Sequence, residues 1–502
     1  MATQHPDNAG VPYWSKESTA FVDARSEVEE AFLSYSQLGC PEYMWDWEGK
    51  HVDEAVVERL FEKHTDYFRS HPLGISEFLT FRVPNPWQES GYKLARAFVN
   101  ITAASQVARE LSMHWPPVFE AILPMTESGR QLHWMRTKYV GLAKALGEVE
   151  LSASGKRSVH PKDIEWIPLV ETTAAMSGAS KILSDYVGLC KASRQPVPDY
   201  LRPFVARSDP ALNSGLVPAV LSAKLCLSQT AKFSSLYNIP TYPIIGVGCL
   251  PFRGGLTPEP SSIRSFAQEY PGVYTPTLQS AFRYDYPQKM VKASIPMLSR
   301  MLGKNPQEYS QSQHAKLSKL IGVFASQYQK TISKLAPTVN RVAKFVPARR
   351  ERRLHVGLFG YSRKVGKASL PRAITFTAAM YSLGVPPELV GTGRGIALAR
   401  KAGALSDLEE AFPTLGLRLR TAGRFLNKEN LQLLASSQSA WKPVLEDVTQ
   451  IESYLGEVLG PVEDEQLLHR NLTSSIRLLV AKNKPAAASE VQRAALLRRS
   501  VG

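Results

Sequence analysis

Short apolar runs alternate with longer amphipathic stretches along most of this chain. The stretches 94–111, 172–191 and 214–236 carry apolar residues at helical spacing. The apolar runs have the length of strands, and alternation of strands with helices favours parallel βα units. The candidate strands are 43–48, 77–83, 120–126, 165–171, 202–208, 243–248, 272–278, 354–360 and 389–393.

The repeated strand and helix units predict an α/β fold, a (β/α)8 TIM-type barrel over approximately 40–395 with additional helices. Nine candidate strands for eight positions mean that at least one of them is not a barrel strand. The runs 272–278 and 389–393 fit least well, because proline or glycine interrupts them.

The pattern changes after about residue 396, where strand signals become rare. The stretches 405–411, 430–435, 441–459 and 465–481 have helical periodicity. No flexible linker precedes them. We therefore expect one domain over 1–502, with a helical C-terminal extension from approximately 396 that packs on the barrel or against a partner subunit.

Composition favours a soluble cytoplasmic protein. Of the 502 residues, 44% are hydrophobic, enough for a substantial core. The longest nearly unbroken apolar stretch, 243–252, contains glycines and is too short to span a membrane. The first twenty residues are polar and lack the apolar core of a signal peptide. The four cysteines lie far apart, which is typical of buried thiols in a reducing compartment.

The formal charge of +15 is compatible with a nucleic-acid partner, an acidic membrane surface or an anionic substrate. The densest basic run, ARRERRLH at 348–355, predicts a solvated face before a strand. It is not interleaved with aromatic residues, and no zinc-finger or RNA-binding motif is present. A nucleic-acid-binding protein is therefore only a remote alternative.

Polar residues at the ends of the candidate strands suggest a site, because the active sites of such barrels gather there. Several arginines around one cavity require an anion, and carboxylates among them suit a divalent cation. As structural alternatives, Glu171 could face a helix dipole, Asp209 could be an N-cap, and 252–259 could be a plain glycine turn. The strand-end residues are Arg82, Glu127, Glu171, Asp209, Arg253, Gln279, Arg363 and Arg394.

Several motifs together resemble one family, the short archaeal-type phosphoenolpyruvate carboxylases, which also occur in some bacteria. The resemblance covers most of the chain, and its most specific part is TQHPDN followed by MWDWEGKHVDEAVV. The later motifs are EWIPLVET, ARSDPALNSG, PFRGGLTPE and LPRAITFTAAMYSLGVPPELVGTGRG.

The resemblance implies carboxylation of phosphoenolpyruvate with bicarbonate to give oxaloacetate and phosphate. The reaction would pass through carboxyphosphate and a metal-stabilised pyruvate enolate. It would use Mg²⁺ or Mn²⁺ and no biotin, and the family also implies a homotetramer.

The resemblance also implies roles for individual residues. Glu171 and Asp209 would hold the metal, and His5 would handle the proton of carboxyphosphate. Arg253 would be the arginine of a mobile loop that has Gly254 and Gly255 as hinges. The remaining substrate-binding residues would be Arg82, Arg363 and Arg372, to which the strand-end position adds Gln279.

Two departures from the long plant and bacterial enzymes concern the basic groups of the site. Leu212 stands where those enzymes have a lysine, and this chain has one RGG turn where they have two. Which basic groups contact bicarbonate therefore stays open. The main alternative is another metal-dependent barrel lyase or aldolase that acts on phosphoenolpyruvate or pyruvate enolate.

Overall fold

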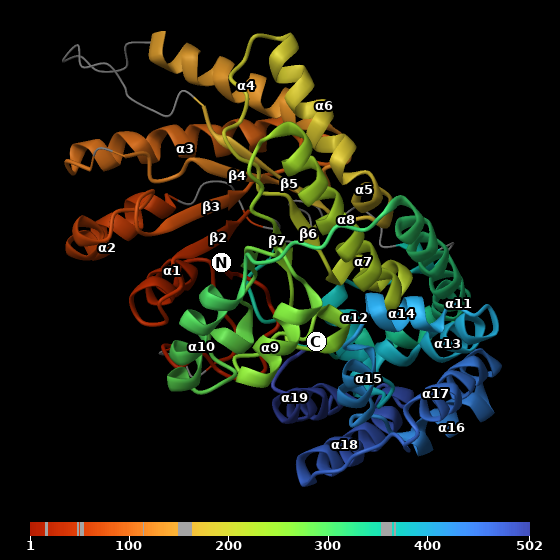
Figure 1. The fold of residues 1–502 in the computed structure, drawn as a ribbon. Helices are drawn as coiled ribbons and strands as arrows, with labels where there is room; N and C mark the ends of the chain where they lie inside the picture. Colours follow the sequence, from red (N-terminus) through yellow and green to blue (C-terminus); the bar gives the residue numbers. More distant parts are fainter. Residues whose placement is uncertain are drawn as a thin grey trace.

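The computed structural model describes residues 1–15, 19–47, 50, 55–113, 115–148, 163–352, 364–365 and 368–502. Its centre is an eight-stranded parallel sheet in which the strands follow one another in sequence order (Figure 1). The strands are β1 (Ala2–Thr3), β2 (Glu42–Asp46), β3 (Phe78–Arg82), β4 (Glu120–Leu123), β5 (Glu165–Val170), β6 (Phe204–Ala206), β7 (Ile244–Gly246) and β8 (Thr275–Pro276).

The sheet is curled, and hydrogen bonds connect its first strand with the segment that follows its last. The amide of Thr3 donates to the carbonyl oxygen of Leu278 over 3.2 Å, and the amide of Leu278 donates to the carbonyl oxygen of Met1 over 2.8 Å. On its other edge, β1 pairs with β2, with Thr3 opposite Met44. The first few residues of the chain are therefore part of the sheet.

Most predicted strands are confirmed, with one omission and one error. Strands β2 to β7 lie within or overlap the six runs between 43 and 248, and β8 lies within 272–278. The N-terminal strand β1 was not predicted. The predicted strand 389–393 is wrong, since these residues connect a 3₁₀ turn, η4 (Pro387–Leu389), to the helix α13 (Thr392–Lys401). The run 354–360 lies outside the described residues.

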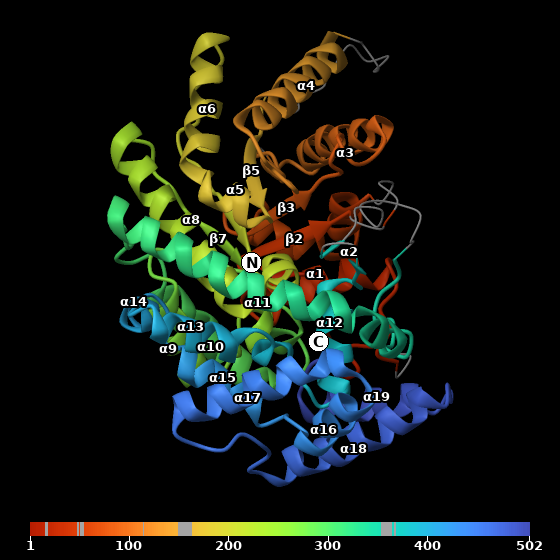
Figure 2. The ribbon, with the colours of Figure 1, turned by 90° about the vertical axis from the view of Figure 1, so that its right-hand side faces the viewer.

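Helices surround the sheet, and Figures 1 and 2 show α2, α3, α4, α6 and α8 on its outer side. The first ten helices are α1 (Ser26–Ser36), α2 (Val56–Ser70), α3 (Gly91–Glu110), α4 (Gly129–Glu148), α5 (Thr173–Ser177), α6 (Ala179–Ala192), α7 (Ser208–Ser214), α8 (Leu216–Tyr237), α9 (Pro260–Glu269) and α10 (Gln288–Met301). They cover the predicted helical stretches, except that a break at Gly178 divides 172–191 into α5 and α6.

The C-terminal part is helical, but its helices begin well before the predicted boundary at about residue 396. The part after residue 415 lies to one side of the sheet in both views (Figures 1 and 2). Its helices are α11 (Gln311–Ala343), α12 (Ala373–Ser382), α13, α14 (Leu405–Ala411), α15 (Leu415–Gly423), α16 (Lys428–Ser437), α17 (Lys442–Leu455), α18 (Asp464–Ala481) and α19 (Ala487–Leu497). Short turns η1 (Pro251–Arg253), η2 (Ser280–Phe282) and η5 (Ser439–Trp441), and a hairpin of β9 (Lys364–Val365) and β10 (Ala368–Ser369), complete the described elements.

One continuous cluster of buried apolar residues runs from the sheet into the C-terminal helices, from Met1 to Ala494. The extension therefore shares its core with the sheet. All four cysteines are buried and free, as predicted. Within the described residues, no helix is both long and apolar enough to cross a bilayer.

Candidate active site

A cavity of about 290 Å³ lies at the carboxyl ends of several strands. This volume is at the lower end of the range for ligand pockets, roughly 300–1,000 Å³, and suits a small ligand. Of the ten predicted site residues, six line it: His5, Arg82, Glu171, Asp209, Arg253 and Arg372. The chain thus brings together residues that are up to 367 positions apart, from His5 to Arg372.

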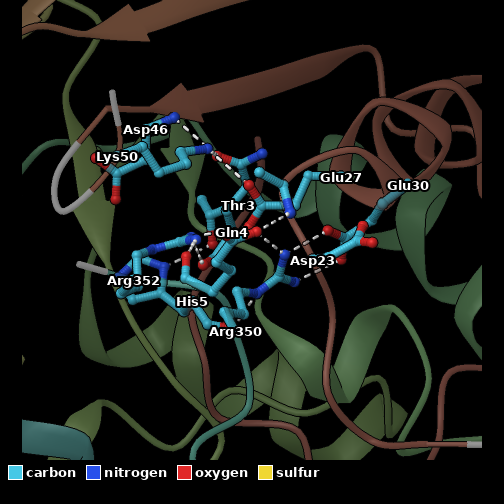
Figure 3. Close-up of polar contacts among 12 residues, drawn as sticks. Thr3, Gln4, His5, Asp23, Glu27, Glu30, Asp46, Lys50, Arg350 and Arg352 are labelled. Atoms are coloured by element: carbon cyan, nitrogen blue, oxygen red, sulfur yellow. Dashed lines mark hydrogen bonds and ion pairs between the residues drawn. The ribbon is translucent and has the colours of Figure 1, made fainter. Parts of the chain in front are cut away.

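His5 reaches this cavity because β1 is a strand of the sheet. His5 lies two residues beyond β1, and its Nδ1 is 2.8 Å from the Thr3 hydroxyl. The side chain of Gln4 accepts hydrogen bonds from the amide of Asp46 and from Lys50 Nζ, over 2.9 and 2.8 Å (Figure 3). The N-terminal segment is therefore fixed in place, unlike the frayed end that is usual for a terminus.

The environment of His5 favours the neutral form of its imidazole. Burial lowers its pKa well below the usual value of 6.5, and the positive charges of Arg253 and Arg82 lower it further. A neutral imidazole has a lone pair that can accept a proton, and the lowered pKa makes it a weaker base than a free histidine.

Three neighbouring arginines bind the backbone of the N-terminal segment. Arg350 Nε donates to the carbonyl oxygen of His5 over 3.4 Å, and Arg352 Nη2 donates to that of Gln4 over 3.3 Å (Figure 3). Arg349 Nε donates to the carbonyl oxygen of Asn8 over 2.7 Å. We refer to Arg349, Arg350 and Arg352 as the arginine clamp.

The arginine clamp corrects the prediction of a solvated face at 348–355 for its described part, 348–352. Arg349 and Arg350 are only 6% and 3% exposed, and all three clamp residues line the cavity. Arg350 also forms ion pairs of 2.8 and 2.7 Å with Glu27 and Glu30 of α1. Spacing within the run gave no signal of these partners, because they lie more than 300 residues away in sequence.

The carboxylates of α1 remain charged although they are buried. Burial alone raises the pKa of Glu27, but the nearby charges of Arg352, Lys50 and Arg350 outweigh this and lower it to about 2. Glu30 accepts in addition from Arg283, whose Nη2 donates to the carbonyl oxygen of His5 over 3.2 Å. Arg283 and Arg350, which both pair with Glu30, thus both donate to the carbonyl oxygen of His5.

Arg82 is aligned by the neighbouring strand. It ends β3 opposite Asp46 of β2, and the two side chains form a double hydrogen bond of 2.8 and 2.5 Å. Such fork-shaped pairing fixes the plane of the guanidinium group. Asp46 also lines the cavity and was not predicted.

Glu171 and Asp209 follow two paired strands, β5 and β6, and both line the cavity. Glu171 Oε2 accepts from the amide of Met125 over 2.8 Å, which orients its carboxylate. Two hard oxygen ligands from adjacent strands fit Mg²⁺ or Mn²⁺, which complete their coordination with water and substrate oxygens. Among the described residues there is no cluster of three or more His, Cys, Asp or Glu side chains arranged for a metal.

Arg253, in the turn η1, is held by a network of polar contacts and is only 1% exposed. Its guanidinium donates to the Ser208 hydroxyl (3.2 Å), the Gln279 side-chain oxygen (2.5 Å), the Gly502 carbonyl oxygen (2.6 Å) and Asp7 (3.4 Å). Gln279 therefore acts on Arg253 and does not line the cavity itself. Segments from both ends of the chain meet at this arginine.

The glycines after Arg253 are tightly packed. Gly254 has φ +124° and Gly255 has φ +69°, a region that favours glycine. An added Cβ would lie 2.5 Å from Val247 Cγ1 at Gly254 and 2.0 Å from Arg418 Nη1 at Gly255. In this structure the loop is packed in place, and the mobility expected of it stays a prediction.

Three other predicted strand-end residues have different outcomes. Arg394 belongs to α13 and forms a 2.9 Å ion pair with Asp447 of α17, so it has a structural partner. Glu127 is exposed and does not line the cavity. Arg363 lies outside the described residues.

Comparisons with known proteins identify the family of this chain. The family model described as "Phosphoenolpyruvate carboxylase" matches residues 1–502. A protein of that name from Oenococcus oeni is 38% identical, over 100% of this chain and 98% of the relative. Those from Metallosphaera sedula and Methanothermobacter thermautotrophicus are also 38% identical, over 100% and 89% of this chain and 99% and 90% of the relatives. This chain belongs to the phosphoenolpyruvate carboxylase family, in its archaeal-type form.

Proposed function

We propose that this protein carboxylates phosphoenolpyruvate with bicarbonate, giving oxaloacetate and phosphate. The observation that carries the proposal is one cavity lined by His5, six arginines and the carboxylates Glu171 and Asp209. We further infer that the sheet is a closed (β/α)8 barrel. The hydrogen bonds between β1 and Leu278 support this closure.

The arginines that line the cavity are suited to the phosphoryl group. In the proposed reaction, bicarbonate attacks phosphorus, and carboxyphosphate and the enolate of pyruvate form. Arg82, Arg253 and Arg372 would offset the negative charge of the transferring group and hold it in position. Arg363 is assigned to the same task by family resemblance alone.

His5 would take the proton of carboxyphosphate, which then breaks down to carbon dioxide and phosphate. The enolate captures the carbon dioxide. The neutral imidazole can accept this proton, while Thr3 on its Nδ1 side and the two arginines on its carbonyl oxygen fix its position. Burial of the site would limit the access of water to the two short-lived intermediates, carboxyphosphate and the enolate of pyruvate.

Glu171 and Asp209 would hold Mg²⁺ or Mn²⁺, and no biotin would be required. When bound, the metal would supply positive charge that stabilises the developing enolate. We also propose a cytoplasmic enzyme that assembles as a homotetramer, as its family resemblance implies.

The proposed reaction is tested by a coupled assay. Purified protein with phosphoenolpyruvate and Mg²⁺ is expected to form oxaloacetate, read through added malate dehydrogenase, only when bicarbonate is present. Malate dehydrogenase reports oxaloacetate by oxidising NADH. If the rate of NADH oxidation does not change when bicarbonate is removed, another lyase or aldolase acting on the same substrate is favoured instead.

A second test asks whether the arginine clamp positions His5. Arg350→Lys keeps a positive charge beside Glu27 and Glu30 but removes the Nε donor to the His5 carbonyl oxygen. We expect kcat for oxaloacetate to fall about tenfold, roughly the value of one charge-assisted hydrogen bond. The ratio of pyruvate to oxaloacetate should rise, because proton removal follows cleavage of phosphoenolpyruvate.

The matched control is Arg349→Lys, which alters the neighbouring contact with Asn8 and leaves the His5 contacts intact. A merely structural role for Arg350 would lower both products in parallel. An unchanged product ratio in Arg350→Lys would therefore contradict the positioning role.

A further inference from the structure

A second group of buried cations lies behind the glycine turn, outside the cavity. Arg207 follows β6 and is 1% exposed, and Arg418 in α15 is 7% exposed. Arg207 Nε donates to the Tyr270 hydroxyl over 2.9 Å, and Arg418 Nη1 donates to the carbonyl oxygen of Gly255 over 2.8 Å. Both contacts are to neutral oxygens, so neither offsets a positive charge.

Among the described residues, Glu269 is the carboxylate whose charge acts on Arg418, and it is engaged elsewhere. Glu269 Oε1 accepts from Lys224 Nζ over 2.8 Å, and its Oε2 accepts from the backbone amide and hydroxyl of Thr414. Counting Arg207, Arg418 and Lys224 against Glu269 leaves a formal excess of two positive charges, three minus one. Within the described residues, neither arginine has a carboxylate at ion-pair distance.

Each of the two guanidinium groups also has one nitrogen donor without a hydrogen-bond partner among the described residues. Arg207 Nη1 and Arg418 Nη2 are buried and have no hydrogen-bond partner among the described residues. Burial lowers the pKa of Arg418, and the charge of Arg207 adds to this effect. A water molecule could satisfy the two donors but would leave the buried charge uncompensated, which is costly.

We propose that Arg207 and Arg418 bind a small inorganic anion of the halide class between their unpaired donors. A halide is a single-atom acceptor that could accept hydrogen bonds from both arginines, and its charge would reduce the local excess. Both arginines are more than nine-tenths buried, which favours an ion of this size over a larger organic anion. The inference concerns the folded protein and does not depend on the proposed reaction.

The proposed anion site is linked to the cavity through residues next to Arg253 and Asp209. Arg418 holds the carbonyl oxygen of Gly255, two residues from Arg253, and Arg207 stands two residues before Asp209. An anion that bridges the two arginines would join the glycine turn to the segment that carries Asp209. It would thereby stabilise the packed form of the turn.

The test compares thermal unfolding in sodium chloride and in sodium gluconate at equal ionic strength. We expect a saturable increase of the wild-type Tm in chloride, as for any ligand that binds the folded state. In Arg418→Met the halide should bind at least about tenfold more weakly, because a charge-assisted hydrogen bond is lost. Bromide in crystals of the wild type should give an anomalous peak between the two arginines.

Arg420→Met is the matched control, since Arg420 lies on the same helix but is about half exposed and pairs with Glu457. It removes one positive charge and should keep the full chloride effect. If Arg418→Met does not fold, Arg418→Lys provides the same comparison. Equal wild-type stability in chloride and gluconate, or a full chloride effect in the Arg418 variant, would overturn the proposal.

Discussion

Glu171→Gln is expected to lower oxaloacetate formation by about 10²–10³-fold while leaving the fold intact. Removal of one metal carboxylate costs several kcal/mol of charge stabilisation, by the usual order of magnitude for such sites. The glutamine side-chain oxygen can still accept from the amide of Met125, so the local backbone should persist. Initial rates across a Mg²⁺ titration, together with melting curves, measure the two effects separately.

Glu127→Gln is the control for this substitution. Glu127 was also predicted at a strand end, but it is exposed and lies outside the cavity lining. It should retain wild-type rates at every metal concentration. Near wild-type activity of Glu171→Gln at low Mg²⁺ would show that the metal assignment is wrong.

His5→Asn is expected to reduce oxaloacetate formation by at least about a hundredfold, within the roughly 10²–10⁴-fold range of general-base catalysis. Asparagine can still contact the Thr3 hydroxyl, but it cannot accept the proton. Phosphoenolpyruvate cleavage should survive better than carboxylation, because bicarbonate attack on phosphorus precedes proton removal. Oxaloacetate and pyruvate are measured in the same reaction.

His133→Asn serves as the matched histidine control. His133 is half-buried on α4, outside the cavity lining, and its Nε2 lies 2.9 Å from the Ser193 hydroxyl, so its loss should leave both products unchanged. Melting behaviour should be similar in both variants. Oxaloacetate production by His5→Asn at the full rate would mean that the N-terminal segment has no role in catalysis.

Hydrophobic periodicity predicted most strands of the sheet. It missed the strand β1 and wrongly predicted a strand at 389–393. β1 has only two residues, too few for any alternating pattern, and it is a strand because β2 and Leu278 hold it. The apolar run at 389–393 resembles a strand, yet Gly391 adopts φ +74° and its amide donates to Asp447 Oδ2. A carboxylate from α17 therefore begins a helix where local pattern predicted a strand.

The site was predictable where its residues follow strands and was missed where it depends on distant partners. Arg82 is the last residue of β3, and Glu171 and Asp209 follow β5 and β6. Their positions could therefore be predicted from the strand pattern of the sequence. The arginine clamp could not, because its partners are the buried carboxylates of α1 and backbone carbonyl groups of residues 4 to 9. His5 was found through motif resemblance, since composition gave it no distinction.

The anchoring of the N-terminal segment also constrains the order in which the chain can fold. His5 and Arg350 are 345 residues apart in sequence, and Ala9 and Gln492, which are also hydrogen-bonded, are 483 apart. Contacts of such long range are slow to form, because the loop-closure entropy must be overcome before they contribute any stability. During synthesis the segment leaves the ribosome long before these partners, Arg350 and Gln492, emerge. The chemistry of the site is therefore assembled late, when the C-terminal helices have already been made.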